Sequence, residues 1–146
     1  MIILAGACSV SGDAEELFRN GHYKSALKSF NQRAAEGDPN AINFVGIHYY
    51  LGAGVERDFG EAARWFERAA LKRHADAQRN LGIMYMRGLG VAQDNHRAYG
   101  WMFHANAGGN QSARRYMKQM SDNVTPNATM QARDKVEELI QTAAVQ

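Results

Sequence analysis

The sequence contains one cysteine, Cys8, and two prolines, Pro39 and Pro126. A single cysteine excludes an internal disulfide framework and a cysteine-rich zinc site. No stretch approaches the roughly 20 apolar residues that a transmembrane helix needs. The charge is nearly balanced, with 17 Lys and Arg against 15 Asp and Glu, and the basic residues are dispersed along the chain. No nucleic-acid partner is therefore expected, because such a partner calls for a concentrated basic surface.

The residue patterns of common active sites are also missing. The five histidines include no pair at i and i+4 and no His-Glu-x-x-His motif. No serine lies in Gly-x-Ser-x-Gly, and the glycine-rich stretches 52–54 and 88–90 lack the Gly-Lys-Ser/Thr of a phosphate loop. We therefore expect no catalytic residue, no metal site and no cofactor.

The sequence does contain an internal repeat with a period of 36 residues. The segments 41–76 and 77–112 align without gaps. Identical residues recur at this spacing, among them Gly46 and Gly82, Val55 and Val91, and Trp65 and Trp101. So many identities at one spacing indicate a structural unit that occurs in tandem.

Each unit has the pattern of two helices joined by a glycine-containing loop. Ala41, Val45 and Tyr49 lie at i, i+4 and i+8, which places them on one face of a helix. Gly52 follows this helix, at a position where a left-handed residue commonly ends one. Asp58 suits the N-cap of the next helix. The pattern predicts a helical hairpin, and the whole chain is predicted to be all-α.

Upstream of the two complete units, the pattern continues in a degenerate form. We expect a short helix over residues 13–20, opened by a capping box of Asp13 and Glu16. A second helix is expected over about residues 22–36, because its alanine and phenylalanine positions lie 36 residues before those of the first complete unit.

Downstream, a helix through Ala113 carries Lys118 where the complete units have glycine. Thr125 and Pro126 then suit the N-cap and first turn of a last helix. Its apolar face is expected to consist of Ala132, Val136, Leu139 and Ile140. Residues 13–146 are therefore predicted to form one α-solenoid domain of about four helix-turn-helix repeats with a C-terminal capping helix.

Residues 1–12 differ from this pattern. The apolar start of the chain leads into Leu4-Ala5-Gly6-Ala7-Cys8, which resembles the lipobox of bacterial lipoproteins. That resemblance implies lipidation of Cys8 and a periplasmic protein tethered to a membrane, with no other membrane contact. The alternative is a disordered apolar N-terminus with an incidental thiol.

The second unit carries the most complete motif. It reads Leu81-Gly82-x-x-Tyr85-x-x-Gly88-x-Gly90-Val91-x-x-Asp94-x-x-x-Ala98-x-x-Trp101, and it is echoed from Val45 to Trp65. This motif closely resembles the Sel-one-like repeat (SLR) family, whose members are relatives of tetratricopeptide repeat proteins. The resemblance implies a right-handed superhelix whose concave groove, lined by the first helix of each hairpin, binds a partner protein.

The partner-binding residues should lie on the flank of the first helices that the core does not need. These positions are Asn43, Phe44, Tyr50, Arg79, Asn80, Met86, Arg87, Arg115 and Gln119. Aromatic, Met and Arg side chains in an open groove are typical of binding hot spots, and the arginines favour an acidic partner surface. The alternative for Phe44, and for the neighbouring Ile47 and Ile83, is that they pack against adjacent helices.

Three functional hypotheses follow. Members of the SLR family act as adaptors and assembly factors, and some small envelope-anchored bacterial members are immunity proteins that neutralise secreted toxic effectors, including lipases. We therefore expect a non-catalytic, monomeric, protein-binding module, most concretely an immunity protein that binds a secreted effector enzyme. A scaffold in envelope or exopolysaccharide assembly is the alternative. A hydrolase is disfavoured, because no catalytic constellation is present.

Overall fold

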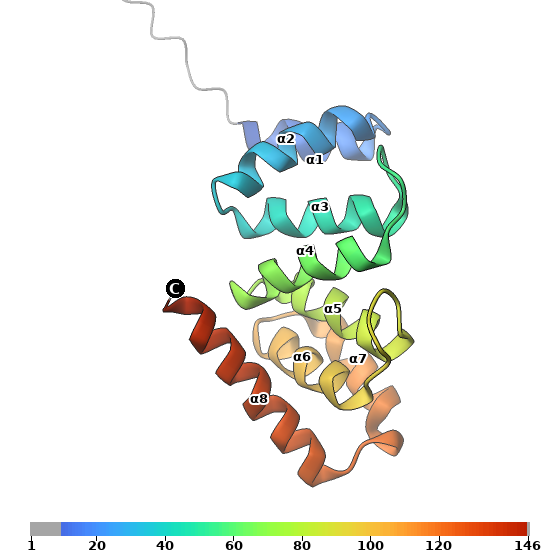
Figure 1. Cartoon of the computed structure of the whole chain (residues 1–146), viewed down its shortest axis with the longest axis vertical. Helices are drawn as coiled ribbons and strands as arrows, with labels where there is room; N and C mark the ends of the chain where they lie inside the picture. Colours follow the sequence, from blue (N-terminus) through green and yellow to red (C-terminus); the bar gives the residue numbers. More distant parts are fainter. Residues whose placement is uncertain (1–9, 146) are drawn as a thin grey trace, which may run out of the picture.

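The computed structural model describes residues 10–145, which form an all-helical stack with no β-strand within that range (Figure 1). The elements are α1 (Val10–Arg19), α2 (Tyr23–Ala35), α3 (Pro39–Leu51), α4 (Phe59–Leu71), α5 (Ala75–Arg87), α6 (Asn95–Ala107), α7 (Gln111–Met120), the short 3-10 helix η1 (Ser121–Asn123) and α8 (Pro126–Ala144). The all-α tandem-repeat fold predicted from the 36-residue period is confirmed.

Successive helices pack against one another along the stack. The hairpins are α1–α2, α3–α4 and α5–α6, and each hairpin packs on the next through the contacts of α2 with α3, α4 with α5, and α6 with α7. Each helix from α2 to α6 therefore buries a face on the helix before it and on the helix after it. This arrangement joins the hairpins into one elongated body.

The loop inside each complete repeat has the predicted geometry. Gly52 ends α3 in the left-handed region at φ 70°, and the Asp58 carboxylate accepts a hydrogen bond from the backbone N–H of Glu61 at the start of α4. Gly54, at φ 74°, lies against the backbone of Tyr23 and Lys24, where a Cβ would come within 2.8 Å. The loop thus needs glycine both for its conformation and for its contact with the preceding hairpin.

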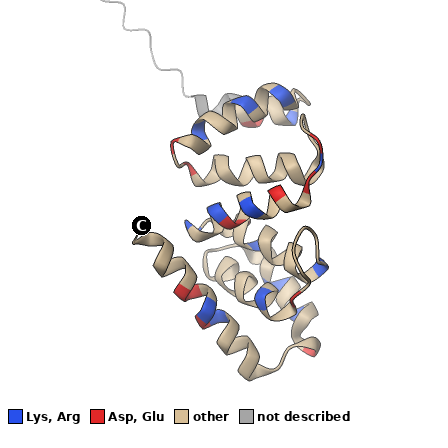
Figure 2. Ribbon diagram, viewed as in Figure 1, with Lys and Arg blue, Asp and Glu red and all other residues tan. Residues whose placement is uncertain are grey.

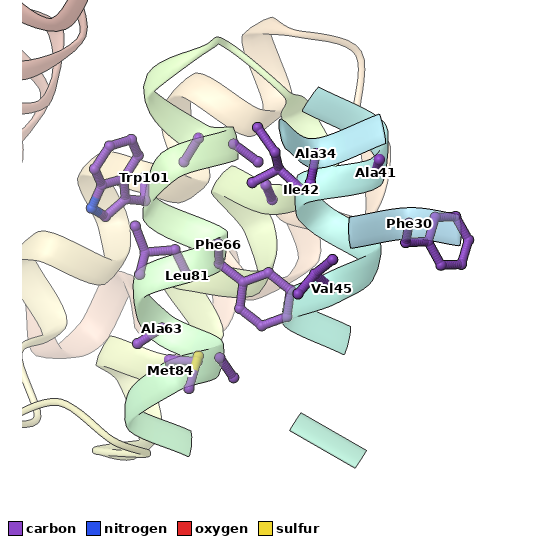
Figure 3. Packing of buried hydrophobic residues seen from close by; sticks show 14 of the residues in the cluster. Phe30, Ala34, Ala41, Ile42, Val45, Ala63, Phe66, Leu81, Met84 and Trp101 are labelled. Carbon is purple, nitrogen blue, oxygen red and sulfur yellow. The ribbon is translucent and has the colours of Figure 1, made fainter. Parts of the chain in front are cut away.

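Small residues let the paired helices approach closely. Gly46 in α3 faces the ring of Phe66 in α4, and a Cβ at this position would lie 2.7 Å from the ring. Phe66 is buried beside Val45 (Figure 3). The equivalent glycine of the next repeat, Gly82, lies against Met102 of α6. Both Gly positions recognised in the repeat are therefore packing positions.

The ends of the stack differ from the prediction in detail. The first helix begins at Val10, three residues earlier than expected, so Asp13 lies inside α1 and cannot be its N-cap. Leu139 was expected on the buried face of the last helix, but it is 41% exposed, whereas Val136 and Ile140 are buried. The predicted caps of that helix are confirmed, with Thr125 accepting from the backbone N–H of Ala128.

The last helix packs mainly on α6, with a smaller contact on α4, and does not form a fourth hairpin with α7 (Figure 1). Lys118 of α7 occupies the position of Gly46 and Gly82, so a close second helix cannot pack there. Gly100 of α6 provides the alternative, because its missing side chain leaves room for the backbone of α8 at Ala132. The capping helix therefore crosses the second helices of the stack.

Candidate partner-binding groove

A small groove opens between the two complete repeats. It has a volume of about 170 Å³ and is lined by Ile47 and Tyr50 of α3, Phe66 of α4, and Arg79, Asn80 and Ile83 of α5. We call this site the α3–α5 groove. Ile47 and Ile83 occupy the same position of successive repeats, so the repeat itself supplies two of its apolar walls.

The aromatic wall of the groove is held by packing. The Tyr50 ring contacts Phe59 edge to face, with centroids 5.3 Å apart, and lies 6.5 Å from the centroid of Phe66. Tyr50 is half-buried, and Phe66 is only 2% exposed. The wall is therefore rigid before any partner binds, which reduces the entropic cost of association.

A chain of side-chain hydrogen bonds forms the polar rim. Asn43 of α3 is buried, and its Oδ1 accepts a hydrogen bond from Nδ2 of Asn80 at 3.1 Å. Asn80 Oδ1 in turn accepts from Nη2 of Arg79 at 2.8 Å. The buried amide of Asn43 thus positions Asn80, and Asn80 positions the guanidinium of Arg79.

The first helices of the repeats carry an excess of positive charge. The helices α3, α5 and α7 contain one acidic residue, Asp76, and five basic residues. The basic residues are Arg79, Arg87, Arg114, Arg115 and Lys118. The helix α3 contains no Lys, Arg, Asp or Glu (Figure 2). The carboxylate of Asp76 accepts a hydrogen bond from Asn110, near the start of α7.

The structure brings together only some of the predicted binding residues. Tyr50, Arg79 and Asn80 line the groove, and Asn43 lies directly beneath its rim. Arg87, Arg115 and Gln119 are exposed on α5 and α7 but lie outside this groove. Arg115 instead lines a separate cleft with Tyr99 and Lys118.

Two predicted residues serve the core. The Phe44 ring stacks on Phe30 at a centroid distance of 4.4 Å and an interplanar angle of 3°, and it also contacts Phe18. Its assignment to the groove is wrong, and the alternative of packing against adjacent helices holds. Met86 is half-buried against the core cluster that contains Met102. Asn43, at 4% exposure, is a supporting residue and is too buried to be a contact surface.

Three groove residues were not among the predicted contacts. Phe66 was assigned to the core, where it does lie, but one side of its ring also faces the groove. For Ile47 and Ile83 the sequence left packing against neighbouring helices open as the alternative to a groove position, and both are half-buried at the groove wall.

His48 has a structural environment. It is fully buried, its Nδ1 donates to the carbonyl oxygen of Ala53 at 2.6 Å, and the ring lies 5.0 Å from the centroid of Phe18. Its Nε2 is buried without a hydrogen-bond partner among the described residues. Burial lowers the pKa of His48, although the hydrogen bond to Ala53 acts in the opposite direction. The imidazole is therefore held in its neutral form.

Other predicted features lie partly or wholly outside the structure. Cys8 and its lipobox-like neighbours fall outside the described residues. Within residues 10–145, no three His, Cys, Asp or Glu side chains converge as they would around a metal ion. No helix in the same range is long and apolar enough to cross a bilayer.

Comparison with known protein families agrees with the 36-residue repeat found in the sequence. The family model described as Sel1 repeat matches residues 39–74 and 75–110, two residues earlier than the repeat boundaries predicted above and with the same period. None of the curated proteins gives a significant match.

Solved structures that are similar to this chain include two Sel1-like repeat proteins. One is a protective antigen of uropathogenic Escherichia coli that displays an SLR fold, with 26% identity and a TM-score of 0.82, covering 90% of this chain. The other is a Sel1 repeat protein from Oxalobacter formigenes, with 26% identity and a TM-score of 0.73, covering 87% of this chain. The matched region spans only 29% and 54% of those two proteins, respectively.

Proposed function

Because this chain is a Sel1-like repeat protein, we propose that it works as a non-catalytic monomer that binds one partner protein in the α3–α5 groove. The observation that carries this proposal is the composition of the groove. Rigid aromatic and aliphatic walls surround a small cavity, and an arginine and an asparagine form its rim. Such a combination of an apolar centre with a polar edge is characteristic of protein–protein hot spots.

The more specific proposal is an immunity protein of the bacterial periplasm, anchored through Cys8, that binds and neutralises a secreted effector enzyme. The lipobox-like segment Leu4–Cys8 supports the location. The small size of the groove between the two repeats supports recognition of one partner. The alternative is a scaffold in envelope or exopolysaccharide assembly, for which several partners would be expected.

The binding proposal is tested by capture from bacterial envelope extracts followed by reconstitution. The full chain serves as bait beside a groove variant, Arg79→Glu combined with Ile83→Asn, and a control variant, Arg64→Glu. Arg64 lies exposed on α4, away from the groove, so the control reverses the same charge without altering the site. Circular dichroism and thermal unfolding establish that all three forms are folded.

We expect one stoichiometric partner that the wild type and the Arg64→Glu control retain and that the groove variant loses. The same result must be reproduced with the purified partner. Equal retention by all three forms would exclude the α3–α5 groove as the binding site. If the partner is an enzyme that is toxic in the periplasm, co-expression of this chain should restore growth. Several partners without toxicity would favour the scaffold.

A further inference from the structure

The guanidinium of Arg79 has no acidic partner among the residues that the structure describes. No carboxylate of the described residues lies within 4.0 Å of it, and its Nε is buried without a hydrogen-bond partner. By contrast, Arg33, another half-buried arginine, pairs with Glu15 at 3.2 Å and with Asp38 at 2.7 Å. A partly desolvated charge without a counter-ion is unfavourable, because it has lost water and gained no opposite charge.

The position of Arg79 is nevertheless fixed. The hydrogen bonds from Arg79 to Asn80 and from Asn80 to Asn43 hold the guanidinium at the edge of the groove. A neutral amide oxygen orients a guanidinium but does not neutralise it. Arg79 therefore presents a preorganised positive charge, and guanidinium groups form their strongest hydrogen bonds with carboxylates.

The neighbouring surface has the same sign. The first helices α3, α5 and α7 contain five basic residues and one acidic residue, although the whole sequence has a formal charge of only +2. Basic residues on α7 thus extend the positive field beyond Arg79. This distribution should attract an acidic segment and repel a basic one.

The groove itself is too small for a folded element. Its volume of about 170 Å³ is below the range of about 300–1,000 Å³ that is typical of small-molecule sites. Ile47, Tyr50, Phe66 and Ile83 make most of its lining apolar. It therefore suits a single large aliphatic or aromatic side chain, which is the usual form of a hot-spot anchor.

We infer that the α3–α5 groove recognises an acidic protein segment in which a bulky apolar side chain lies next to an Asp or Glu. The apolar side chain fills the cavity, and the carboxylate pairs with Arg79 at the rim. This inference deepens the proposed function and rests on its assignment of the groove as the binding site.

The test uses random ten-residue peptides displayed on phage and selected on the immobilised full chain. We expect enriched peptides to carry Asp or Glu within two residues of Leu, Ile, Met or Phe. The best peptide is then synthesised with a fluorescent label, and its affinity is measured by anisotropy for the wild type, Arg79→Gln and Arg64→Gln. Arg79→Gln removes the charge and keeps a hydrogen-bonding amide.

Arg79→Gln should weaken binding by about tenfold or more, because a charged hydrogen bond is lost, while Arg64→Gln should leave it unchanged. Ile83→Asn should weaken binding independently, and increasing salt should weaken the wild type most strongly. Enrichment of basic or uncharged peptides, equal affinity for Arg79→Gln, or no enriched peptide at all would overturn the inference.

The two proposals fail in distinguishable ways. If a native partner is captured through the groove but binds independently of Arg79 charge and of salt, the acidic recognition is wrong and the proposed function stands. If acidic peptides bind in an Arg79-dependent manner but no native partner depends on the groove, the groove chemistry stands and the proposed function fails.

Discussion

Gly100 of α6 lies directly against the backbone of Ala132 in α8. A Cβ atom at Gly100 would come within 2.7 Å of the Ala132 carbonyl oxygen, and within 3.0 Å of Cγ2 of Val136. The equivalent residue one repeat earlier is Arg64, which is exposed on α4. The change from a large side chain to none therefore marks the surface on which α8 packs.

Substitution of Gly100 by Ala should destabilise the protein, although alanine is the better helix former. The clash involves a backbone oxygen, which cannot move away by changing a rotamer, so α8 must shift. We expect the free energy of unfolding to fall by about 1–3 kcal/mol in urea denaturation. Gly60→Ala is the matched control, because a Cβ there meets only the Asp58 side chain, at 3.2 Å. The control should lose nothing or gain up to about 1 kcal/mol, and an equal loss in both variants would contradict this account.

The two glycines shared by the complete repeats should differ in their tolerance of alanine. A Cβ at Gly46 would lie 2.7 Å from the buried Phe66 ring. A Cβ at Gly82 would have longer contacts, at 3.0 and 3.1 Å from Cε and Cγ of Met102 and at 3.2 Å from the carbonyl oxygen of Ala98. Phe66 has a rigid ring that is only 2% exposed, whereas a methionine side chain adapts readily. Gly46→Ala should therefore cost about 1–3 kcal/mol, and Gly82→Ala should cost less because all its contacts are longer. Thermal unfolding of both variants measures the order, and a larger loss for Gly82→Ala would show that Phe66 is not the rigid neighbour.

The central part of the fold could be predicted because its determinants are local and repeated. Gly52 ends α3, Asp58 begins α4, and the apolar spacing of α3 defines its buried face. The same residues and spacing recur 36 residues later. The path of α8 could not be predicted in this way. It depends on Gly100 meeting Ala132, and these two residues have no counterpart in the other repeats.

The candidate site was predicted in part for the same reason. Tyr50, Arg79 and Asn80 were found as residues of the first helices that the core does not require, and they do line the groove. Phe44 has the same repeat position as Asn80, but its surroundings are Phe18 and Phe30 of the degenerate first hairpin. That hairpin lacks the repeat motif, so the sequence did not indicate an aromatic cluster there.

Below about pH 6.5, the free energy of unfolding should decrease as the pH is lowered. Burial lowers the pKa of His48 and of His74 from the ordinary value of 6.5. Below that value the unfolded chain binds protons that the folded protein resists, so each histidine reduces the free energy of unfolding by up to about 1.4 kcal/mol per pH unit until its folded pKa is reached. Above pH 6.5 these histidines should have no effect.

Urea denaturation between pH 5 and 7.5 measures this dependence, with two variants to assign it. His48→Met introduces the residue type of the equivalent position, Met84, and should flatten the curve. His74→Asn retains a capping side chain for α5 and should remove only the contribution of His74 to the pH dependence. Glu137 and Asp38 have lowered pKa values and titrate at more acidic pH, so they do not contribute in this range. A His48→Met curve as steep as the wild type would show that His48 is not responsible.

Asn80→Asp should suppress binding of an acidic partner, because it places a carboxylate next to Arg79. One carboxylate oxygen would replace the amide oxygen that accepts from Arg79 Nη2 at 2.8 Å, and the new charge would neutralise the guanidinium within the protein. The substitution also removes the hydrogen bond that Asn80 Nδ2 donates to Asn43 Oδ1, so circular dichroism and thermal unfolding must establish that the variant is folded. An acidic segment would then meet a paired charge and an additional negative charge at the rim. We expect the affinity for the selected acidic peptides to fall by about tenfold or more, with a weaker dependence on salt. Asn106→Asp is the matched control, since it adds the same charge at an exposed position of α6. If both variants bind as well as the wild type, the free charge of Arg79 is not what the partner recognises.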